Sequence, residues 1–270
     1  MAKLSQSRYE RDVALVSASQ QEILLADLDS PKPLLINEKG FDIIAEIKRK
    51  SPAEGKISTE GLSLSDQAKD YITGGAIAVS VLTEPDYFGG SFDDLSGIAF
   101  NSNSLPVMCK DFLVSPYQIR QARLAGASGV LLIAGILNSA ELEQMFCAAN
   151  DLDMFVLFEV FDQDDLEKIL SLLEKIGNAT EERLCRYLIG VNCRNLRDLE
   201  VNFSHFETML AKLPNNVPWV AESGLKTILQ AEQLAQWGYR LALAGTTLMK
   251  SNNPSRMVAD LAAAGRAKCL

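Results

Sequence analysis

The chain has 270 residues, of which 47% are hydrophobic, so it can bury a large core as one domain or two. Its formal net charge is −9 at pH 7, which would repel the phosphates of nucleic acids and the surface of anionic lipids. We therefore expect neither nucleic acid nor a membrane as a partner, whereas a local pocket for a small anionic molecule stays possible.

The first forty residues are helical in places and contain two breaks. The patterns at Tyr9–Val16 and Gln20–Leu28 favour helices, and Pro31 and Pro33 interrupt the chain after them. No low-complexity linker separates a second domain. We expect a single domain over residues 1–270, with residues 1–40 as an N-terminal extension that packs on or caps the rest.

From residue 42 onward, short apolar runs alternate with amphipathic stretches. The predicted strands are Asp42–Lys48, Ala76–Leu82, Leu105–Lys110, Val130–Ala134, Met154–Val160, Tyr187–Cys193, Val217–Glu222 and Leu241–Gly245. The predicted helices are Leu64–Thr73, Ser91–Ala99, Pro116–Ala125, Ser139–Asn150, Asp162–Leu173, Phe203–Leu213, Leu225–Trp237 and Pro254–Ala264. Strand–helix units repeated in this way predict a closed (β/α)8 TIM barrel. An open doubly wound sheet usually has fewer strands and a nucleotide-binding glycine loop, which this sequence lacks.

Polar and charged residues interrupt the predicted strands near their carboxyl ends, where the active sites of such barrels lie. They are Glu46 and Lys48 on one face of the first strand, Lys110, Glu159, Asn192 with Arg194 just beyond it, and Glu222. A charge inside an apolar run is costly unless it is paired or functional. Structural ion pairs, such as Glu46 with Lys48, would account for single residues. Five strand ends together favour an active site.

Small and hydroxyl-bearing residues follow the last two strands. Ser223 and Gly224 come after the seventh strand, and Gly245 and Thr246 come after the eighth. The loops at these positions commonly bind phosphate, because glycine lets backbone N–H groups approach and hydroxyls add donors. The alternative is that Ser223 and Thr246 only cap the helices after them.

Histidine and cysteine usage limits the possible chemistry. The five cysteines are scattered and form no CxxC pair, which indicates reduced thiols and argues against a zinc site. The single histidine, His205, lies at a polar helix start and is expected to face solvent. Neither a signal peptide nor a run of about 20 apolar residues is present, so we expect a cytoplasmic protein. Because the chain has one histidine and no metal-binding motif, we expect no metal or other cofactor.

Several segments resemble those of indole-3-glycerol phosphate synthases, in the same order, from about Phe41 to Met249. They are Ile43–Pro52 (IIAEIKRKSP), Ser80–Glu84 (SVLTE), Tyr87–Ser91 (YFGGS), Lys110–Phe112 (KDF), Phe158–Val160 (FEV), Gly190–Leu196 (GVNCRNL) and Ala221–Gly224 (AESG). The resemblance implies a lyase of tryptophan biosynthesis that acts on 1-(2-carboxyphenylamino)-1-deoxyribulose 5-phosphate. The aromatic ring carbon attacks the sugar carbonyl, and carbon dioxide and water are lost.

The resemblance also implies roles for individual residues. Lys110 resembles the general acid that protonates the carbonyl oxygen, and Glu159 the acid or base of dehydration. Lys48 resembles the residue that holds a substrate anion and assists proton transfer. The other implied residues are Glu46, Asn192 and Glu222 around the reacting carbons, Ser51, Ser223, Gly224, Gly245 and Thr246 beside the phosphate, Phe88, Phe112 and Leu131 as apolar walls, and Arg194 as a further substrate contact. A buried lysine near a second cation is expected to have a lowered pKa.

Several features depart from the family pattern, and two rival functions remain. Met108 and Cys109 stand where the family more often has a leucine and an arginine, and the N-terminal extension matches poorly. Ala53 stands where the family usually has a second serine, and Phe161 where a histidine is expected. Phosphoribosylanthranilate isomerases and histidine-pathway isomerases use a Cys/Asp or Asp/Asp pair, whereas the first strand here ends in Glu46 and Lys48. A non-catalytic relative would be expected to lack Lys110 or Glu159. We expect a monomer or a weak homodimer.

Overall fold

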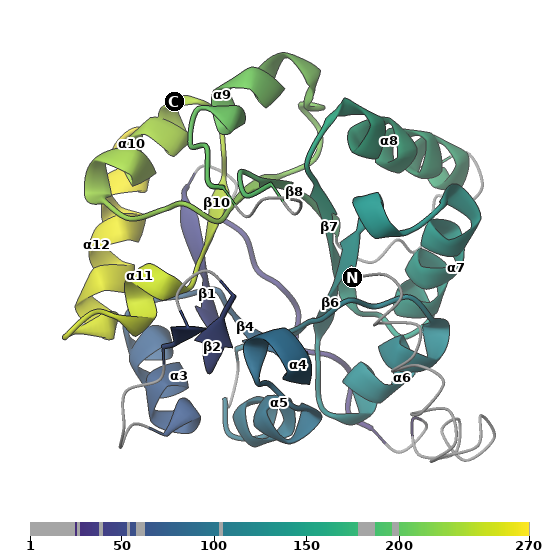
Figure 1. Ribbon diagram of the computed structural model, residues 1–270, viewed down its shortest axis with the longest axis horizontal. Coiled ribbons are helices and arrows are strands. Elements are labelled where there is room, and N and C mark those ends of the chain that lie inside the picture. Colours follow the sequence, from purple (N-terminus) through teal and green to yellow (C-terminus); the bar gives the residue numbers. More distant parts are fainter. Residues whose placement is uncertain are drawn as a thin grey trace.

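The protein forms a closed barrel of eight parallel strands (Figure 1). The computed structural model describes residues 25, 28–37, 40–52, 55–57, 63–102, 105–177, 187–195 and 200–269. The strand order around the barrel is β1-β10-β9-β8-β7-β6-β5-β4, and every neighbouring pair is parallel. The (β/α)8 TIM barrel predicted from the sequence is confirmed.

The observed strands agree closely with the predicted ones. They are β1 Asp42–Ile47, β4 Ala78–Leu82, β5 Val107–Lys110, β6 Gly129–Ile133, β7 Phe155–Val160, β8 Tyr187–Asn192, β9 Trp219–Glu222 and β10 Leu241–Ala244. Apart from β6, which begins one residue early, each lies within its predicted range. A short antiparallel hairpin, β2 (Lys50–Ser51) with β3 (Gly55–Lys56), follows β1.

Helices surround the barrel in a ring (Figure 1). They are α3 Leu64–Thr73, α4 Pro85–Phe88, α5 Phe92–Ala99, α6 Pro116–Leu124, α7 Ser139–Asn150, α8 Gln163–Gly177, α9 His205–Met209, α10 Ile228–Gln236, α11 Thr246–Met249 and α12 Pro254–Arg266, with 3-10 turns η1 Ala134–Ile136 and η2 Leu210–Lys212. Among the described residues, no helix has both the length and the apolar character needed to cross a bilayer.

The structure differs from the predicted helices in several places. Helix α4, Pro85–Phe88, was not among the predicted helices, and Pro85 lies in its first turn. Helix α10 begins at Ile228, three residues later than predicted, because Thr227 forms a capping box with Gln230. The helix expected over Phe203–Leu213 is shorter and continues as the 3-10 turn η2.

Two apolar clusters hold the fold together. The larger lies between the outward faces of the strands and the helices. The smaller fills the barrel itself, and its buried members are Leu34, Ile44, Ala78, Met108, Leu131, Ile133, Phe155, Leu157, Leu188, Val220, Leu241 and Leu243. Leu34 belongs to residues 28–37, drawn in purple in Figure 1, which precede β1 and contribute a side chain to the barrel interior.

The start of β1 is tied to both the preceding segment and the last helix. Asp42, 1% exposed, accepts a hydrogen bond from Arg266 Nη2 on α12 at 2.7 Å and one from the backbone N–H of Asn37 at 3.1 Å. Arg240, just before β10, donates to the carbonyl oxygens of Asn37 and Gly40. These contacts join the first and last parts of the barrel.

Candidate functional site

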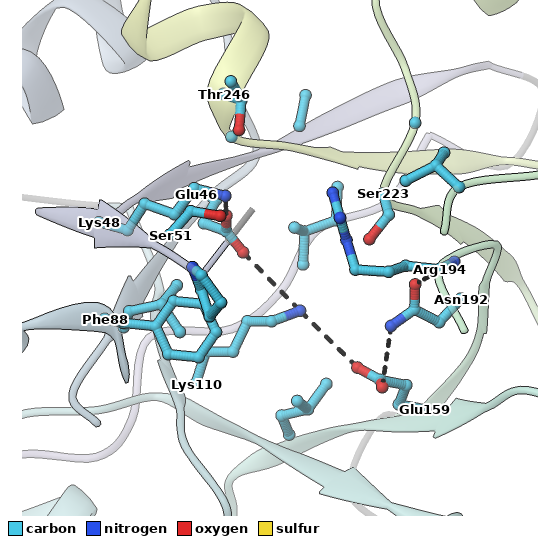
Figure 2. A pocket seen from close by; sticks show the side chains of 18 of the residues that line it. Glu46, Lys48, Ser51, Phe88, Lys110, Glu159, Asn192, Arg194, Ser223 and Thr246 are labelled. Carbon is cyan, nitrogen blue, oxygen red and sulfur yellow. Dashed lines mark hydrogen bonds and ion pairs between the residues drawn. The ribbon is translucent and has the colours of Figure 1, made fainter. Parts of the chain in front are cut away.

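A cavity of about 750 Å³ lies at the carboxyl ends of the barrel strands (Figure 2). It brings together all but one of the residues singled out from the sequence. Those that line it are Glu46, Lys48, Ser51, Phe88, Lys110, Phe112, Leu131, Glu159, Asn192, Arg194, Ser223, Gly224, Gly245 and Thr246. The exception is Glu222, which is fully buried and contacts the cavity residue Lys110.

Lys110, the last residue of β5, lies among three carboxylates. Its Nζ is 2.7 Å from Glu222 Oε2, and 3.8 Å from both Glu46 Oε2 and Glu159 Oε2. Figure 2 shows the ammonium group between Glu46 and Glu159, which come from strands on different sides of the barrel. One cation therefore joins residues from four separate strands.

These carboxylates determine how tightly Lys110 holds its proton. Burial alone would lower the pKa of the ammonium group, but the negative charges of Glu222, Glu46 and Glu159 outweigh burial and raise that pKa above its ordinary value. The expectation of a lowered lysine pKa was wrong. The nearest charges to Lys110 are anions, so a neighbouring cation does not dominate its protonation.

Glu222 has the most unusual environment of the three carboxylates. Burial raises the pKa of its carboxyl to about 7, with Lys110 acting in the opposite direction and Glu159 and Glu46 adding to the rise. Its Oε1 is buried and has no hydrogen-bond partner among the described residues. A Cβ at Gly190 would lie 2.1 Å from this oxygen, so glycine is what leaves room for the carboxyl group.

Glu46 and Lys48 form a pair at the end of β1. Lys48 Nζ donates to Glu46 Oε1 at 2.6 Å. Although burial acts to raise it, the pKa of Glu46 is lowered by the charges of Lys48 and Lys110. A Cβ at Gly245 would lie 2.3 Å from Glu46 Oε1, so this glycine also makes room for a carboxylate. The pair predicted as a structural alternative exists, and it lies inside the cavity.

Glu159 is oriented by an amide rather than by a close cation. Asn192 Nδ2 donates to Glu159 Oε1 at 3.0 Å, and Asn192 Oδ1 accepts from the backbone N–H of Arg194 at 3.0 Å. The Asn192 amide is thus fixed at both ends, and it leaves Glu159 Oε2 directed toward Lys110 (Figure 2).

Two phenylalanines lie on one side of the cavity. Phe88 is in α4 and Phe112 follows β5, and their ring centroids are 6.5 Å apart in a tilted arrangement. Leu131 of β6 is buried nearby in the same lining. Figure 2 places Phe88 beside Lys110. These side chains provide an apolar surface next to the charged centre.

The backbone after β9 is unusual. Ser223 has φ 68° and Gly224 has φ 73°, and a left-handed conformation is uncommon for serine. Neither Ser223 nor Thr246 caps the following helix, because Thr227 caps α10 and Gly245 precedes α11 without a side-chain cap. Helix capping therefore does not explain why these hydroxyl groups face the cavity.

The candidate residues taken from the sequence did not include four charged residues of the lining. Glu84 and Asp111, each 3% exposed, are buried carboxylates, and Lys226 and Lys250 are exposed lysines. The signal for Asp111 was its position directly after a strand end, and Glu84 lies two residues beyond β4. Lys226 lies in the loop between β9 and α10, and Lys250 directly follows α11, where the sequence does not indicate the direction of a side chain.

Two of the departures from the family pattern, Ala53 and Phe161, have different outcomes. Ala53 lies outside the described residues. Phe161 follows β7 and stacks against His205, with ring centroids 4.8 Å apart and His205 Nε2 2.5 Å from the Phe161 carbonyl oxygen. The expectation that His205 faces solvent was wrong, because this stacking half-buries the ring.

The cavity is not arranged as a metal centre. Across the described parts of the chain, no group of three or more His, Cys, Asp or Glu side chains is arranged to hold a metal ion. Glu46, Glu159 and Glu222 converge on Lys110, whose ammonium group lies where a shared cation would be.

Comparison with known proteins gives consistent results over nearly the whole chain. The sequence model of the family described as indole-3-glycerol phosphate synthase matches residues 5–261. The indole-3-glycerol phosphate synthase of Lacticaseibacillus casei is 35% identical over 260 residues, covering 96% of this chain and 95% of that protein. The enzyme of the same name from Listeria welshimeri is 41% identical over 214 residues, covering 79% of each.

A solved structure with little sequence similarity has the same fold. The 3-hexulose-6-phosphate synthase of Salmonella typhimurium superposes with a TM-score of 0.63 at 14% identity, covering 84% of this chain and 99% of that one. At this identity the likeness concerns the barrel alone.

Proposed function

The chain belongs to the indole-3-glycerol phosphate synthase family of decarboxylating lyases in tryptophan biosynthesis, and from that premise we propose how its residues carry out the reaction. The substrate is 1-(2-carboxyphenylamino)-1-deoxyribulose 5-phosphate. The ring carbon that bears the carboxylate attacks the sugar carbonyl, carbon dioxide leaves, and loss of water completes the indole ring. The observation that carries the proposal is the position of Lys110 between Glu46 and Glu159, beside an apolar wall.

Lys110 is the general acid of ring closure. As the new carbon–carbon bond forms, negative charge develops on the former carbonyl oxygen, which needs a proton donor. A raised pKa keeps the Lys110 ammonium group charged at neutral pH, which is the state that an acid requires. Glu222 does not face the cavity, and it acts through Lys110 by its contact at 2.7 Å.

Glu159 is the base of the dehydration step. After carbon dioxide has left, the hydroxyl group departs as water while a proton is removed from the ring system. Glu159 is 4% exposed, and its Oε1 is held by Asn192. The other oxygen is 3.8 Å from Lys110, so the acid and the base act on neighbouring atoms of one bound molecule.

The remaining lining residues bind the two ends of the substrate. The anthranilate ring packs against Phe88, Phe112 and Leu131, which supply apolar surface. The phosphate is bound beside Ser223, Gly224, Gly245 and Thr246, with Ser51 and Arg194 as further contacts, and Lys48 holds the substrate carboxylate. Aromatic and anionic ends are thereby held with the carbonyl carbon near Lys110.

Indole fluorescence after addition of the substrate tests these roles. We expect Lys110→Ala to lose nearly all activity, because the donor is removed. We expect Glu159→Gln to lower kcat by about 10² to 10⁴, the range typical of removing one acid–base group.

Lys175 and Glu143 provide matched controls. They form an exposed lysine–glutamate pair at 2.6 Å on the outer helices, so Lys175→Ala and Glu143→Gln should retain wild-type activity. Wild-type rates from Lys110→Ala or Glu159→Gln would contradict the assignment of roles.

A further inference from the structure

We propose that Glu84 and Asp111 are positioning residues, which fix the apolar wall of the cavity by binding the backbone N–H groups of Phe88 and Phe112. Neither carboxylate takes part in the acid–base steps proposed above. The inference rests on the proposed function in one respect, which is that the wall contacts the aromatic end of the substrate.

Glu84 organises the short helix that carries Phe88. Its Oε1 accepts from the N–H of Asp86 at 2.9 Å, and its Oε2 accepts from the N–H groups of Tyr87 at 2.6 Å and Phe88 at 3.2 Å. A four-residue helix has little stability of its own. One buried carboxylate therefore satisfies three of its backbone donors and sets the place of the Phe88 ring.

The ends of this segment are also held. The backbone N–H of Gly90 donates to the Glu84 carbonyl oxygen at 2.9 Å, which closes the turn around α4. A Cβ at Gly90 would lie 1.9 Å from the carbonyl oxygen of Leu82, so the turn packs directly on β4. Phe88 is thus attached to the barrel through the residues around Glu84.

Asp111 does the same for Phe112. Its Oδ1 accepts from the N–H of Phe112 at 2.8 Å, and its Oδ2 accepts from the hydroxyl group of Thr83 at 2.6 Å. Thr83 and Glu84 are consecutive, and the N–H of Thr83 donates to the Lys110 carbonyl oxygen at 3.1 Å. The supports of the two rings are therefore neighbours, and they adjoin the segment that carries the proposed acid.

The experiment compares ligands that do and do not contact the wall. The first probe is a substrate analogue in which the ketone is reduced to an alcohol, so that it binds without ring closure. The second is inorganic phosphate, measured as a competitive inhibitor. In Glu84→Gln one oxygen acceptor is replaced by an amide NH2, which cannot accept hydrogen bonds from the backbone N–H groups of α4. We expect the dissociation constant of the analogue to rise roughly three- to tenfold, the range of one aromatic contact, while the inhibition constant of phosphate is unchanged.

A double-mutant cycle separates positioning from general destabilisation. If Glu84 acts through Phe88, then Glu84→Gln adds little to the loss of analogue affinity already caused by Phe88→Leu. Glu84→Asp keeps a carboxylate acceptor and should recover part of the affinity. Asn138→Ala is the matched control, because Asn138 caps α7 through two backbone N–H groups and is not in the cavity lining.

The possible results are distinct. Independent effects of the Glu84 and Phe88 substitutions, equal weakening of both probes, or unchanged analogue binding in Glu84→Gln would each overturn the inference. Failure of the wild-type enzyme to convert the substrate would instead count against the proposed function. Asp111→Asn, tested in the same way with Phe112→Leu, gives an independent result for the second support.

Discussion

The pKa of Glu222 is set by two opposing effects, its burial and the charge of Lys110. The carboxyl group of Glu222 is fully buried, and its Oε2 accepts a hydrogen bond from the Lys110 ammonium group at 2.7 Å. Burial makes the charged carboxylate costly, whereas the lysine favours it, and the net result is a pKa raised to about 7. Glu222 therefore titrates near neutral pH, and it lies directly beside the proposed acid, Lys110.

This raised pKa predicts a pH dependence of stability. The native state binds the Glu222 proton more tightly than the unfolded chain, where the ordinary pKa is 4.5. The stabilising contribution is full below that value and is lost as the pH rises through about 7. Glu222→Gln removes the ionisation, so the wild type should lose stability relative to this variant as the pH rises from about 4.5 to about 7.

Urea unfolding of both proteins at a series of pH values measures the difference. Both proteins contain every other titrating group, so the difference reports the removal of Glu222 together with its coupling to Lys110, Glu46 and Glu159. A stability difference that stays constant across this pH range would show that Glu222 does not titrate there.

At the residue scale, the sequence identified the ionisable residues of the site better than it predicted which of them are in contact. An ionisable residue in an apolar run is recognisable, so Glu46, Lys110 and Glu159 could be found. Which carboxylate is closest to Lys110 depends on the register of four strands and on glycines that leave space. The sequence therefore could not predict that Glu222 is fully buried outside the cavity lining, or that anions would raise the lysine pKa.

The segment before β1 illustrates the contribution of a single irregular element. Residues 28–37 contain no helix or strand, yet Leu34 is 3% exposed and packs with side chains inside the barrel. Its neighbour Leu35 is 71% exposed. Adjacent leucines thus differ almost completely in their burial.

Leu34→Ala should lower the free energy of unfolding by about 2 to 4 kcal/mol, because it leaves a cavity among packed apolar side chains. Leu35→Ala removes the same atoms from an exposed position and should change stability by less than about 0.5 kcal/mol. Denaturant unfolding of the two variants checks this contrast. Similar losses in both would mean that the segment does not stabilise the barrel in this way.

At the element scale, long periodic elements could be predicted and short ones could not. The ranges of α3 and α7 agree to the residue with those expected, because their apolar spacing and their caps, Ser63 and Asn138, indicate the same limits. The four-residue α4 is too short to show a helical period. It depends on the side chain of Glu84, whose orientation no local pattern reveals.

Closure of the barrel depends on contacts between residues far apart in the sequence. Asp42 begins β1, and its partner Arg266 lies near the end of α12. The same carboxylate binds the N–H of Asn37, so three segments meet at one buried side chain.

Asp42→Ala should lower the free energy of unfolding by about 1 to 3 kcal/mol, because it removes the buried carboxylate that accepts hydrogen bonds from Arg266 and Asn37. Asp260→Ala is the control, since Asp260 forms an exposed pair with Arg256 on the same helix and should contribute less than about 0.5 kcal/mol. Unfolding measurements test both, and equal effects would contradict a special role for Asp42. Kinetic constants should not change in either variant, because both residues lie outside the cavity lining.

At the scale of the whole molecule, the architecture was predictable because repetition is a global property of the sequence. Strand–helix alternation predicted the closed barrel, and the parallel pairing of β1 with β10 confirms closure. The partner of Asp42 could not be predicted, since it depends on two ends of the chain meeting after the barrel has closed.

The apolar side chains that fill the barrel interior determine the route by which substrate enters and products leave. Leu34, Ile44 and Met108 belong to this filling, and each is at most 3% exposed, so the interior is a plug rather than a tunnel. Substrate, carbon dioxide, water and product must therefore all enter and leave at the carboxyl ends of the strands. A new substrate molecule can bind only after the indole product has left the cavity.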